Sequence, residues 1–423
     1  MTTEIDAYTN DIHQGDAADR LAEMPESSVH CVVTSPPYWK LRDYNMADQL
    51  GQEPAPEDYV ASIVEIGDQI RRVLRDDGSW WLNLGDSYVS KPRGNPGDDS
   101  TSMINGSHQT ETGGDVKDKR GVGVPEKSKL QIPQRVSLAL LEAGWILRND
   151  IVWMKKGGGV PEPVTDRATK SHEMIYHLVP ADGYWYDTYG VNPDGKPVPD
   201  VWEIYPKPYP EAHFATFPEA LPRRAVRLSC PPEVCAECGT PYRRATEEIE
   251  PWDLSPDDVD RPQLKRALKL YHRSDLTPEH LEASRALGFA DAGHGKNCQT
   301  GTGNNTSRVE ELAAEAKAVL DGYFREFATT KTEPDGFEQA CDCNTDTTES
   351  GIVLDPFAGA GTTCLVAKRL GRRFIGTELN PDYVALAQKR IGVTVDEPDR
   401  LLEDGETSLT AFTDGGTPAE SDR

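Results

Sequence analysis

The stretch GIVLDPFAGAGTTCLVAKRLGRRFIGTELNPDYVALAQKRI, residues 351–391, decides the fold. Its first apolar run predicts a β-strand that ends at Asp355, and a glycine-rich turn then leads into a segment with the pattern of a helix, residues 362–370. A second predicted strand, residues 373–377, ends in Glu378. The order strand, glycine turn, helix, strand, acid is typical of the front of a Rossmann-like nucleotide site, where the acid binds ribose hydroxyls.

The glycine pair Gly359 and Gly361 is, on its own, equally consistent with a plain tight turn. The complete unit with its terminal acid favours a nucleotide site. The loop sequence is GAGTT after DPF, and it has neither a third glycine in register nor a lysine for phosphate groups. This pattern favours a nucleoside ligand without phosphates.

The remaining strands of such a sheet must come from earlier in the chain, because residues 393–423 are acidic and rich in Gly, Ser and Thr, which predicts a disordered tail. Val29–Thr34 is the best candidate for a further strand. A strand there delivers the sequence SPPYW, residues 35–39, to the carboxyl edge of the sheet, where ligands bind in such folds.

Two motifs, TSPPYW near the N-terminus and DPFAGAGTT near the C-terminus, resemble those of the β-class DNA amino-methyltransferases. The similarity covers most of residues 10–230 and 350–392, and the serine at position 35 resembles the cytosine-N4 branch of the family. The resemblance implies an α/β fold with a Rossmann-like, circularly permuted methyltransferase sheet and S-adenosylmethionine as the cofactor. Adenine-specific relatives usually carry Asp or Asn in place of Ser35, and adenine-N6 methylation stays open as the alternative.

The resemblance also implies the residues that bind the cofactor. Those around its amino-acid half are Asp355, Phe357, Gly359, Gly361 and Thr362. Glu378 would bind the ribose hydroxyls, and Asp16 would lie near the adenine. A Gly-Asp pair after a short strand is otherwise only a turn.

The same resemblance implies that the catalytic residues are Ser35, Pro36, Pro37 and Tyr38. The cytosine amino group is a poor nucleophile, so we expect the Ser35 hydroxyl and the Pro36 carbonyl to accept its N–H hydrogens while Pro37 stiffens the turn. Tyr38 would stack on a base rotated out of the duplex. The competing interpretation is a proline-stiffened strand end with core aromatic residues.

Two close cysteine pairs indicate a metal site. Cys235 and Cys238 form a C-x-x-C pair, and Cys341 and Cys343 form a C-x-C pair, which together predict a structural Cys₄ zinc site. The long separation of the pairs leaves unrelated reduced thiols as the alternative.

The predicted organisation has four parts. Residues 1–230 form the catalytic part, with a mobile lid at 90–129 and a short recognition region at 182–209. Residues 231–349 form a zinc-binding helical insertion that shares in recognition of the DNA sequence. Residues 350–392 form the cofactor-binding part, and residues 393–423 form the tail.

Composition adds a constraint, because 45 Lys and Arg against 71 Asp and Glu give a net charge of −26. Such a charge ordinarily argues against nucleic-acid binding. The acidic residues are spread along the whole chain, however, as in proteins of salt-rich cytoplasms, where net charge is a poor guide to binding partners. No apolar run approaches membrane-spanning length, so we expect a soluble, cytoplasmic protein.

The expected function is site-specific transfer of a methyl group from S-adenosylmethionine to N4 of cytosine in double-stranded DNA. The enzyme could be solitary or could accompany a cognate restriction endonuclease. A non-catalytic, zinc-dependent DNA-binding protein is the rival from a different class.

Overall fold

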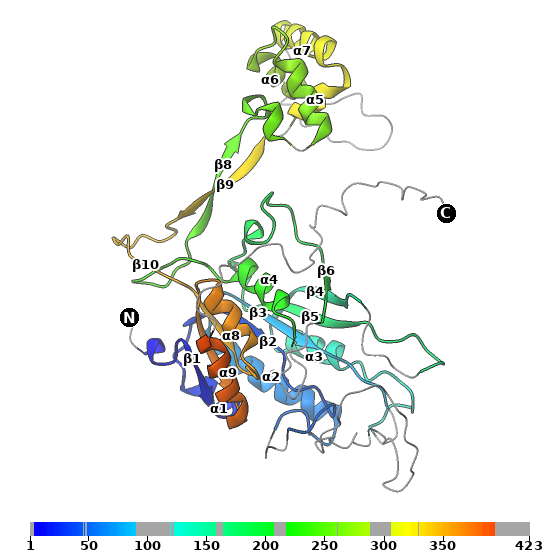
Figure 1. Cartoon of the computed structure of the whole chain (residues 1–423), viewed down its shortest axis with the longest axis vertical. Helices are drawn as coiled ribbons and strands as arrows, with labels where there is room; N and C mark the ends of the chain where they lie inside the picture. Colours follow the sequence, from blue (N-terminus) through cyan, green and yellow to red (C-terminus); the bar gives the residue numbers. More distant parts are fainter. Residues whose placement is uncertain are drawn as a thin grey trace. The chain divides into compact units, whose positions relative to one another are not determined.

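The computed structural model describes residues 4–44, 46, 49–89, 119, 122–157, 164–206, 217–259, 261–287, 306–328 and 330–393. Most of the predicted lid at 90–129 and almost all of the predicted tail at 393–423 lie outside these residues. The chain divides into two compact units. One comprises Met1–Asn192, Lys196–Arg243 and Gln339–Arg423, and the other comprises Pro193–Gly195 and Arg244–Glu338 (Figure 1).

The first unit is built on an eight-stranded sheet within the described residues. Its strand order is β1 (Asp11–Gln14), β12 (Arg373–Glu378), β11 (Ile352–Asp355), β2 (Val29–Thr34), β3 (Leu74–Leu84), β5 (His172–Val179), β4 (Ile146–Lys155) and β6 (Val201–Ile204). The first five strands of this order are parallel, β5 runs antiparallel to both of its neighbours, and β6 is parallel to β4. The predicted α/β class and Rossmann-like sheet are confirmed.

The predicted strand at Val29–Thr34 is confirmed as β2, and it lies beside β11 with Val353 opposite Cys31 and Leu354 opposite Val32. All six residues of β2 are buried, as in strands that are covered on both faces. Parallel pairing therefore places the ends of β2, β11 and β12 at one edge of the sheet.

Helices cover both faces of this sheet. On one face lie α1 (Ala17–Glu23), α2 (Pro56–Val73) and α3 (Ile132–Glu142), and on the other lie α4 (Ala220–Ser229), α8 (Thr362–Arg369) and α9 (Pro381–Val393). Side chains alternate between the two cores with the period of a strand: Val32 and Trp80 face the first core, and Val33 and Trp81 face the second. The result is a three-layer α/β unit.

The second unit has a core of its own. Helices α5 (Pro262–Tyr271), α6 (Pro278–Leu287) and α7 (Ser307–Leu320), with the 3₁₀ segment Asp321–Phe327, enclose Trp252, Leu268, Leu281, Leu320 and Phe327. A two-stranded ribbon of β8 (Arg243–Ile249) and β9 (Lys331–Glu338) leads to and from these helices (Figure 1).

The cysteine pairs lie outside this helical unit, one before it and one after it in the chain. Cys235 ends the short strand β7 (Val234–Cys235), which pairs with β10 (Thr348–Glu349). Both pairs of cysteines belong to the unit that contains the large sheet. Within the described residues, no helix is both long and apolar enough to cross a membrane.

A buried histidine makes the sheet unit sensitive to acid. His177 on β5 stacks on Trp81 with ring centroids 4.1 Å apart, and its Nε2 lies 3.1 Å from the Ser79 hydroxyl. Burial, reinforced by the positive charge of Arg148, lowers the pKa of His177 from 6.5 to about 3. Between these two values the unfolded chain binds a proton that the folded chain does not, so stability falls as pH falls through this window.

We therefore expect His177→Phe, which keeps a flat ring against Trp81, to flatten the pH dependence of the unfolding free energy between about pH 4 and 6.5. The measurement is denaturant unfolding followed by tryptophan fluorescence at a series of pH values. An unchanged slope in the variant would show that His177 already binds its proton in the folded state.

Candidate active site

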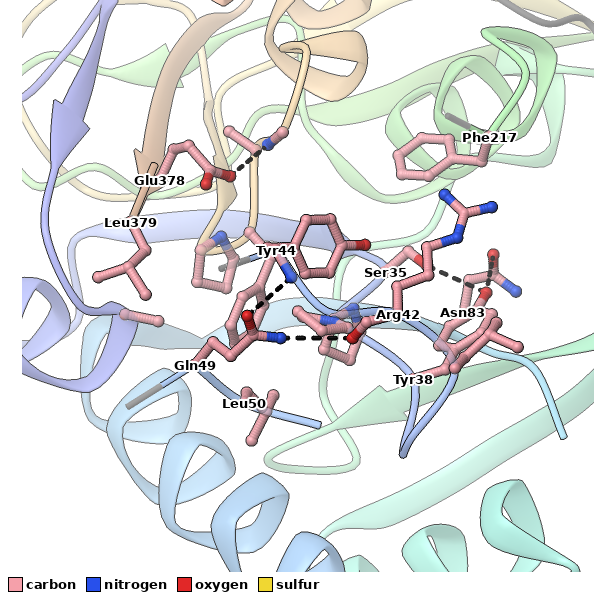
Figure 2. A pocket seen from close by; sticks show the side chains of 18 of the residues that line it. Ser35, Tyr38, Arg42, Tyr44, Gln49, Leu50, Asn83, Phe217, Glu378 and Leu379 are labelled. Carbon is pink, nitrogen blue, oxygen red and sulfur yellow. Dashed lines mark hydrogen bonds between the residues drawn. The ribbon is translucent and has the colours of Figure 1, made fainter. Parts of the chain in front are cut away.

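A cleft with a volume of about 1230 Å³ opens at the carboxyl edge of the sheet, and residues from both ends of the chain line it. The lining includes the segment after β2, the glycine loop after β11, and the end of β12. Figure 2 labels Glu378 on one side of this cleft and Ser35, Tyr38 and Asn83 on the other. The edge where parallel strands end is the usual ligand-binding edge of open α/β sheets.

The glycine loop needs both of its glycines, for different reasons. Gly359 and Gly361 have φ values of 51° and 75°, in the left-handed region that side chains disfavour. A Cβ atom on Gly361 would lie 2.9 Å from the Cβ of Ala387, whereas no atom would lie within 4 Å of one on Gly359. Gly359 therefore leaves open space in the cleft, and Gly361 allows α8 and α9 to pack closely.

Glu378 holds this loop in place. Its Oε2 accepts a hydrogen bond from Gly359 N at 2.9 Å, and its Oε1 accepts one from Asn380 N at 2.9 Å. Burial raises the pKa of this carboxyl above its usual value, and the backbone N–H groups work in the opposite direction. Both oxygens retain a lone pair for a ligand in the cleft.

Asp355 lies beneath the loop and does not line the cleft. Thr34 Oγ1 donates to Asp355 Oδ1 at 2.6 Å, and Phe357 N donates to the same oxygen at 3.1 Å. The side chain is almost fully buried, and burial raises its pKa to about 6 despite these hydrogen bonds. Asp355 thus joins the end of the serine-bearing strand to the glycine loop.

The seven predicted cofactor-binding positions divide into two groups. Those that line the cleft are Asp16, Phe357, Gly359, Thr362 and Glu378, whereas Asp355 and Gly361 lie below it. Asp16 also begins α1, where its carboxylate accepts hydrogen bonds from Ala18 N and Asp19 N. The Thr362 hydroxyl accepts a hydrogen bond from Arg390 at 2.9 Å.

All four predicted catalytic residues, Ser35, Pro36, Pro37 and Tyr38, line the cleft. The Ser35 hydroxyl donates to the Tyr38 hydroxyl at 3.1 Å, and the Tyr38 hydroxyl donates to Glu173 at 2.8 Å. Tyr38 packs tightly on Gly85, where an added Cβ would lie only 2.5 Å from the ring. The ring and hydroxyl of Tyr38 are therefore both fixed, and its hydroxyl aligns Ser35.

A polar network around Glu173 completes this side of the cleft, and the sequence did not predict it. Glu173 Oε1 lies 2.5 Å from Lys155 Nζ, and Glu173 Oε2 accepts a hydrogen bond from Asn83 at 3.3 Å. Burial, followed by the negative charge of Glu173, raises the pKa of Tyr38, so the phenol stays protonated. These residues fall within the region 10–230 that resembles the family, but the assigned motifs gave them no role.

A second unpredicted group, Arg42, Tyr44, Gln49 and Leu50, lies between the two sides of the cleft (Figure 2). Gln49 ties this group together: its Oε1 accepts a hydrogen bond from Tyr44 N at 2.8 Å, and its Nε2 donates one to Arg42 O at 3.4 Å. Burial raises the pKa of Tyr44, and the negative charge of Glu378 contributes to the rise.

The four predicted metal ligands come together. The Sγ atoms of Cys235, Cys238, Cys341 and Cys343 all lie within 4.8 Å of one another. Gly239 follows the first pair with a φ of 71° and donates its N–H to Cys235 O at 2.8 Å, which forms a tight knuckle. The remaining described cysteines, Cys31, Cys230 and Cys364, are buried outside this cluster.

Comparison with known proteins identifies the family. A model for DNA methylases of the N6/N4 type matches residues 29–235 and 344–389, which is more than half of the chain. The chain belongs to this DNA methylase family. It is therefore a DNA amino-methyltransferase with S-adenosylmethionine as its methyl donor.

The chain is also similar to individual relatives and solved structures. The type II methyltransferase M.XycI of Xanthomonas campestris pv. cyanopsidis is 38% identical over 226 residues, which cover 52% of this chain and 73% of that protein. The type II methyltransferase M.SfiI of Streptomyces fimbriatus is 29% identical over 436 residues, covering 92% of this chain and 93% of that protein. The solved structure of the cytosine-N4-specific PvuII DNA methyltransferase is 16% identical, with a TM-score of 0.43 and coverage of 92% and 89%.

Proposed function

We propose that this DNA methylase transfers the methyl group to the exocyclic N4 of cytosine at a specific site in double-stranded DNA. The observation that carries this proposal is the convergence of Ser35 and the glycine loop on one cleft at the carboxyl edge of the sheet. Serine before the two prolines is what favours cytosine. Adenine-N6 methylation is the second candidate, because the same cleft would accept either exocyclic amine.

The residues that line the cleft fit S-adenosylmethionine. Phe357, Gly359 and Thr362 surround a space suited to its amino-acid half, and Glu378 has free lone pairs for ribose hydroxyls. Asp16 lies at the β1 end of the same cleft. The bound cofactor supplies a methyl group on a positive sulfonium, and two of the predicted binding residues, Asp355 and Gly361, act by supporting the loop from below.

Ser35 and Pro36 prepare the amine for attack. Because the Ser35 hydroxyl donates to Tyr38, its oxygen lone pairs remain free to accept an N–H from the base. The Pro36 carbonyl takes the second N–H, and Pro37 fixes the turn. The proton that the amine loses on methylation would be accepted at the Ser35 oxygen, whose own hydrogen faces the Tyr38 hydroxyl and, beyond it, the Glu173 carboxylate.

The target base must leave the duplex to reach this cleft, because its amino group is otherwise paired. The aromatic ring of Tyr38 offers a stacking surface, and Lys156 at the rim of the cleft adds positive charge for the DNA backbone. A cleft of about 1230 Å³ has room for a cofactor and a nucleotide together.

The organisation of the chain follows from this function. We propose that residues 1–230 and 350–392 form one methyltransferase domain in circularly permuted order, interrupted by the insertion at 231–349. The region 182–209 and the insertion share in recognition of the DNA sequence. Since the relatives M.XycI and M.SfiI are type II methyltransferases, a cognate restriction endonuclease is the expected partner.

The four-cysteine cluster fits a structural zinc ion. Tetrahedral zinc with Zn–S bonds of about 2.3 Å places its sulfur atoms about 3.8 Å apart, close to the arrangement present here. The knuckle contacts two central strands: Gly239 O lies 3.3 Å from Nε2 of His30, which is on β2, and Cys238 O accepts from Arg75 on β3 at 3.4 Å. The ion would therefore stabilise the end of the sheet opposite the cleft.

The methyl-transfer proposal predicts the modified base. After incubation of DNA with the protein and labelled S-adenosylmethionine, mass spectrometry of the nucleosides should find label in N4-methylcytosine. Ser35→Ala should lower methyl transfer by about a hundredfold with little change in cofactor affinity. The control Ser28→Ala removes a hydroxyl that donates to Pro25 O before β2 begins, and it should retain wild-type activity.

Label in N6-methyladenine would instead establish the second candidate. No label in either base would contradict the proposal and favour a non-catalytic DNA-binding protein. Equal losses of cofactor binding and methyl transfer in Ser35→Ala would contradict the role assigned to its hydroxyl.

The metal proposal predicts about one zinc ion per chain by elemental analysis. Cys235→Ser should abolish this zinc content and lower the unfolding midpoint. Cys364→Ala removes a buried thiol outside the cluster and should keep the zinc. Zinc content that survives in Cys235→Ser would refute the assignment of the ligands.

A further inference from the structure

A run of positive charge in the helical unit stands out in this acidic chain. Residues 261–273, RPQLKRALKLYHR, contain five Lys and Arg and no Asp or Glu, although the whole chain has a net charge of −26. The run coincides with α5 and the turn that follows it. Solubility does not explain this positive run, because the acidic surface of the chain already keeps the protein soluble.

Helix α5 separates its apolar and basic residues onto opposite faces. Ala267 and Leu268 are fully buried in the core of the helical unit. Arg266 and Lys269 are three residues apart on one side of the helix, Arg273 lies four residues further on in the turn after α5, and all three are exposed. We call these three residues the α5 basic face.

The neighbouring cations of the run are neutralised within the unit, but the α5 basic face is not. Arg261 pairs with Glu326 at 3.1 Å, and Lys265 pairs with Asp257 at 3.7 Å. Among the residues that the structure describes, no carboxylate lies within ion-pair distance of the α5 basic face. The charge of this face is therefore available to an external anion.

The spacing of the face suits a regular row of negative charges. With a helical rise of about 1.5 Å per residue, Arg266 lies about 7.5 Å along the axis from Tyr271, where α5 ends, and Arg273 lies in the turn beyond. Duplex DNA presents one phosphate charge per about 1.7 Å of its axis, so several phosphates lie within that length. The guanidinium of Arg266 stacks over the ring of Tyr323, 5.0 Å from its centroid, which orients it at the surface.

We propose that the α5 basic face binds the phosphate backbone of the duplex DNA on which the methyltransferase acts. This inference rests on the proposed function, because it takes DNA as the substrate. Phosphate contacts of this kind position a protein on DNA and supply affinity without base specificity. In a chain of net charge −26, they would offset part of the repulsion between protein and DNA.

The test uses the full chain with the triple variant Arg266→Gln, Lys269→Gln, Arg273→Gln. Its matched control, Arg308→Gln, Lys317→Gln, Arg325→Gln, loses the same charge from other parts of the helical unit. Fluorescence anisotropy gives the Kd for a labelled duplex of about 30 base pairs over a range of salt concentrations. Circular dichroism checks that both variants retain their helices.

We expect the triple variant to raise the Kd at least about tenfold near 150 mM salt and to reduce the slope of log K against log salt by about 2 to 3. The control should stay within about twofold of the wild type in Kd. If the triple variant loses its helices, the single variant Lys269→Gln is measured in its place. We expect it to reduce the slope of log K against log salt by about 1.

A slope and Kd equal to those of the control would overturn this inference. Methyl transfer measured on the same samples separates the two proposals. Wild-type protein that binds DNA but never methylates it contradicts the proposed function, whereas normal methylation with an unchanged slope in the triple variant contradicts only the role of α5.

Discussion

The pairing of β2 with β11, closed at its end by the hydrogen bond from Thr34 to Asp355, is the constraint on which the site depends. These two residues are 321 positions apart in the chain. Because both strands are parallel and end at the same edge, the serine-proline turn and the glycine loop emerge next to each other. Without this pairing, neither motif has a partner with which to form a cleft.

Hydrogen-bonded carboxylates fix both sides of that cleft. Asp355 holds the glycine loop from below, and Glu173 holds Tyr38 and, through it, Ser35. Asp355 is buried at a cost in solvation that its hydrogen bonds only partly offset, which is why its pKa rises to about 6. Such groups orient the atoms that face a ligand, so that little reorganisation is needed when the ligand binds.

The sequence predicted the parts of the fold that have local signals. Strand β2, the glycine loop and the approach of the two cysteine pairs followed from apolar runs, turn residues and ligand spacing. The sequence did not reveal that Asp355 lies beneath the loop, because a strand-end acid can face either side. It also missed Glu173, whose place depends on the antiparallel pairing of β5 with β3, a long-range contact without a local signature. The main part of the helical unit, Arg244–Glu338, is shorter at both ends than the predicted insertion at 231–349. Its boundary is set by its own core.

Thr34 couples the serine-bearing strand to the glycine loop, and the affinity for S-adenosylmethionine, measured by calorimetry, reports on this coupling. Thr34 does not line the cleft, and its hydroxyl reaches the glycine loop through Asp355. Thr34→Val keeps the shape but removes the hydroxyl, and it should weaken cofactor binding about five- to tenfold, whereas Thr34→Ser keeps the donor and should stay near the wild type. Equal affinities of Thr34→Val, Thr34→Ser and the wild type would contradict the account.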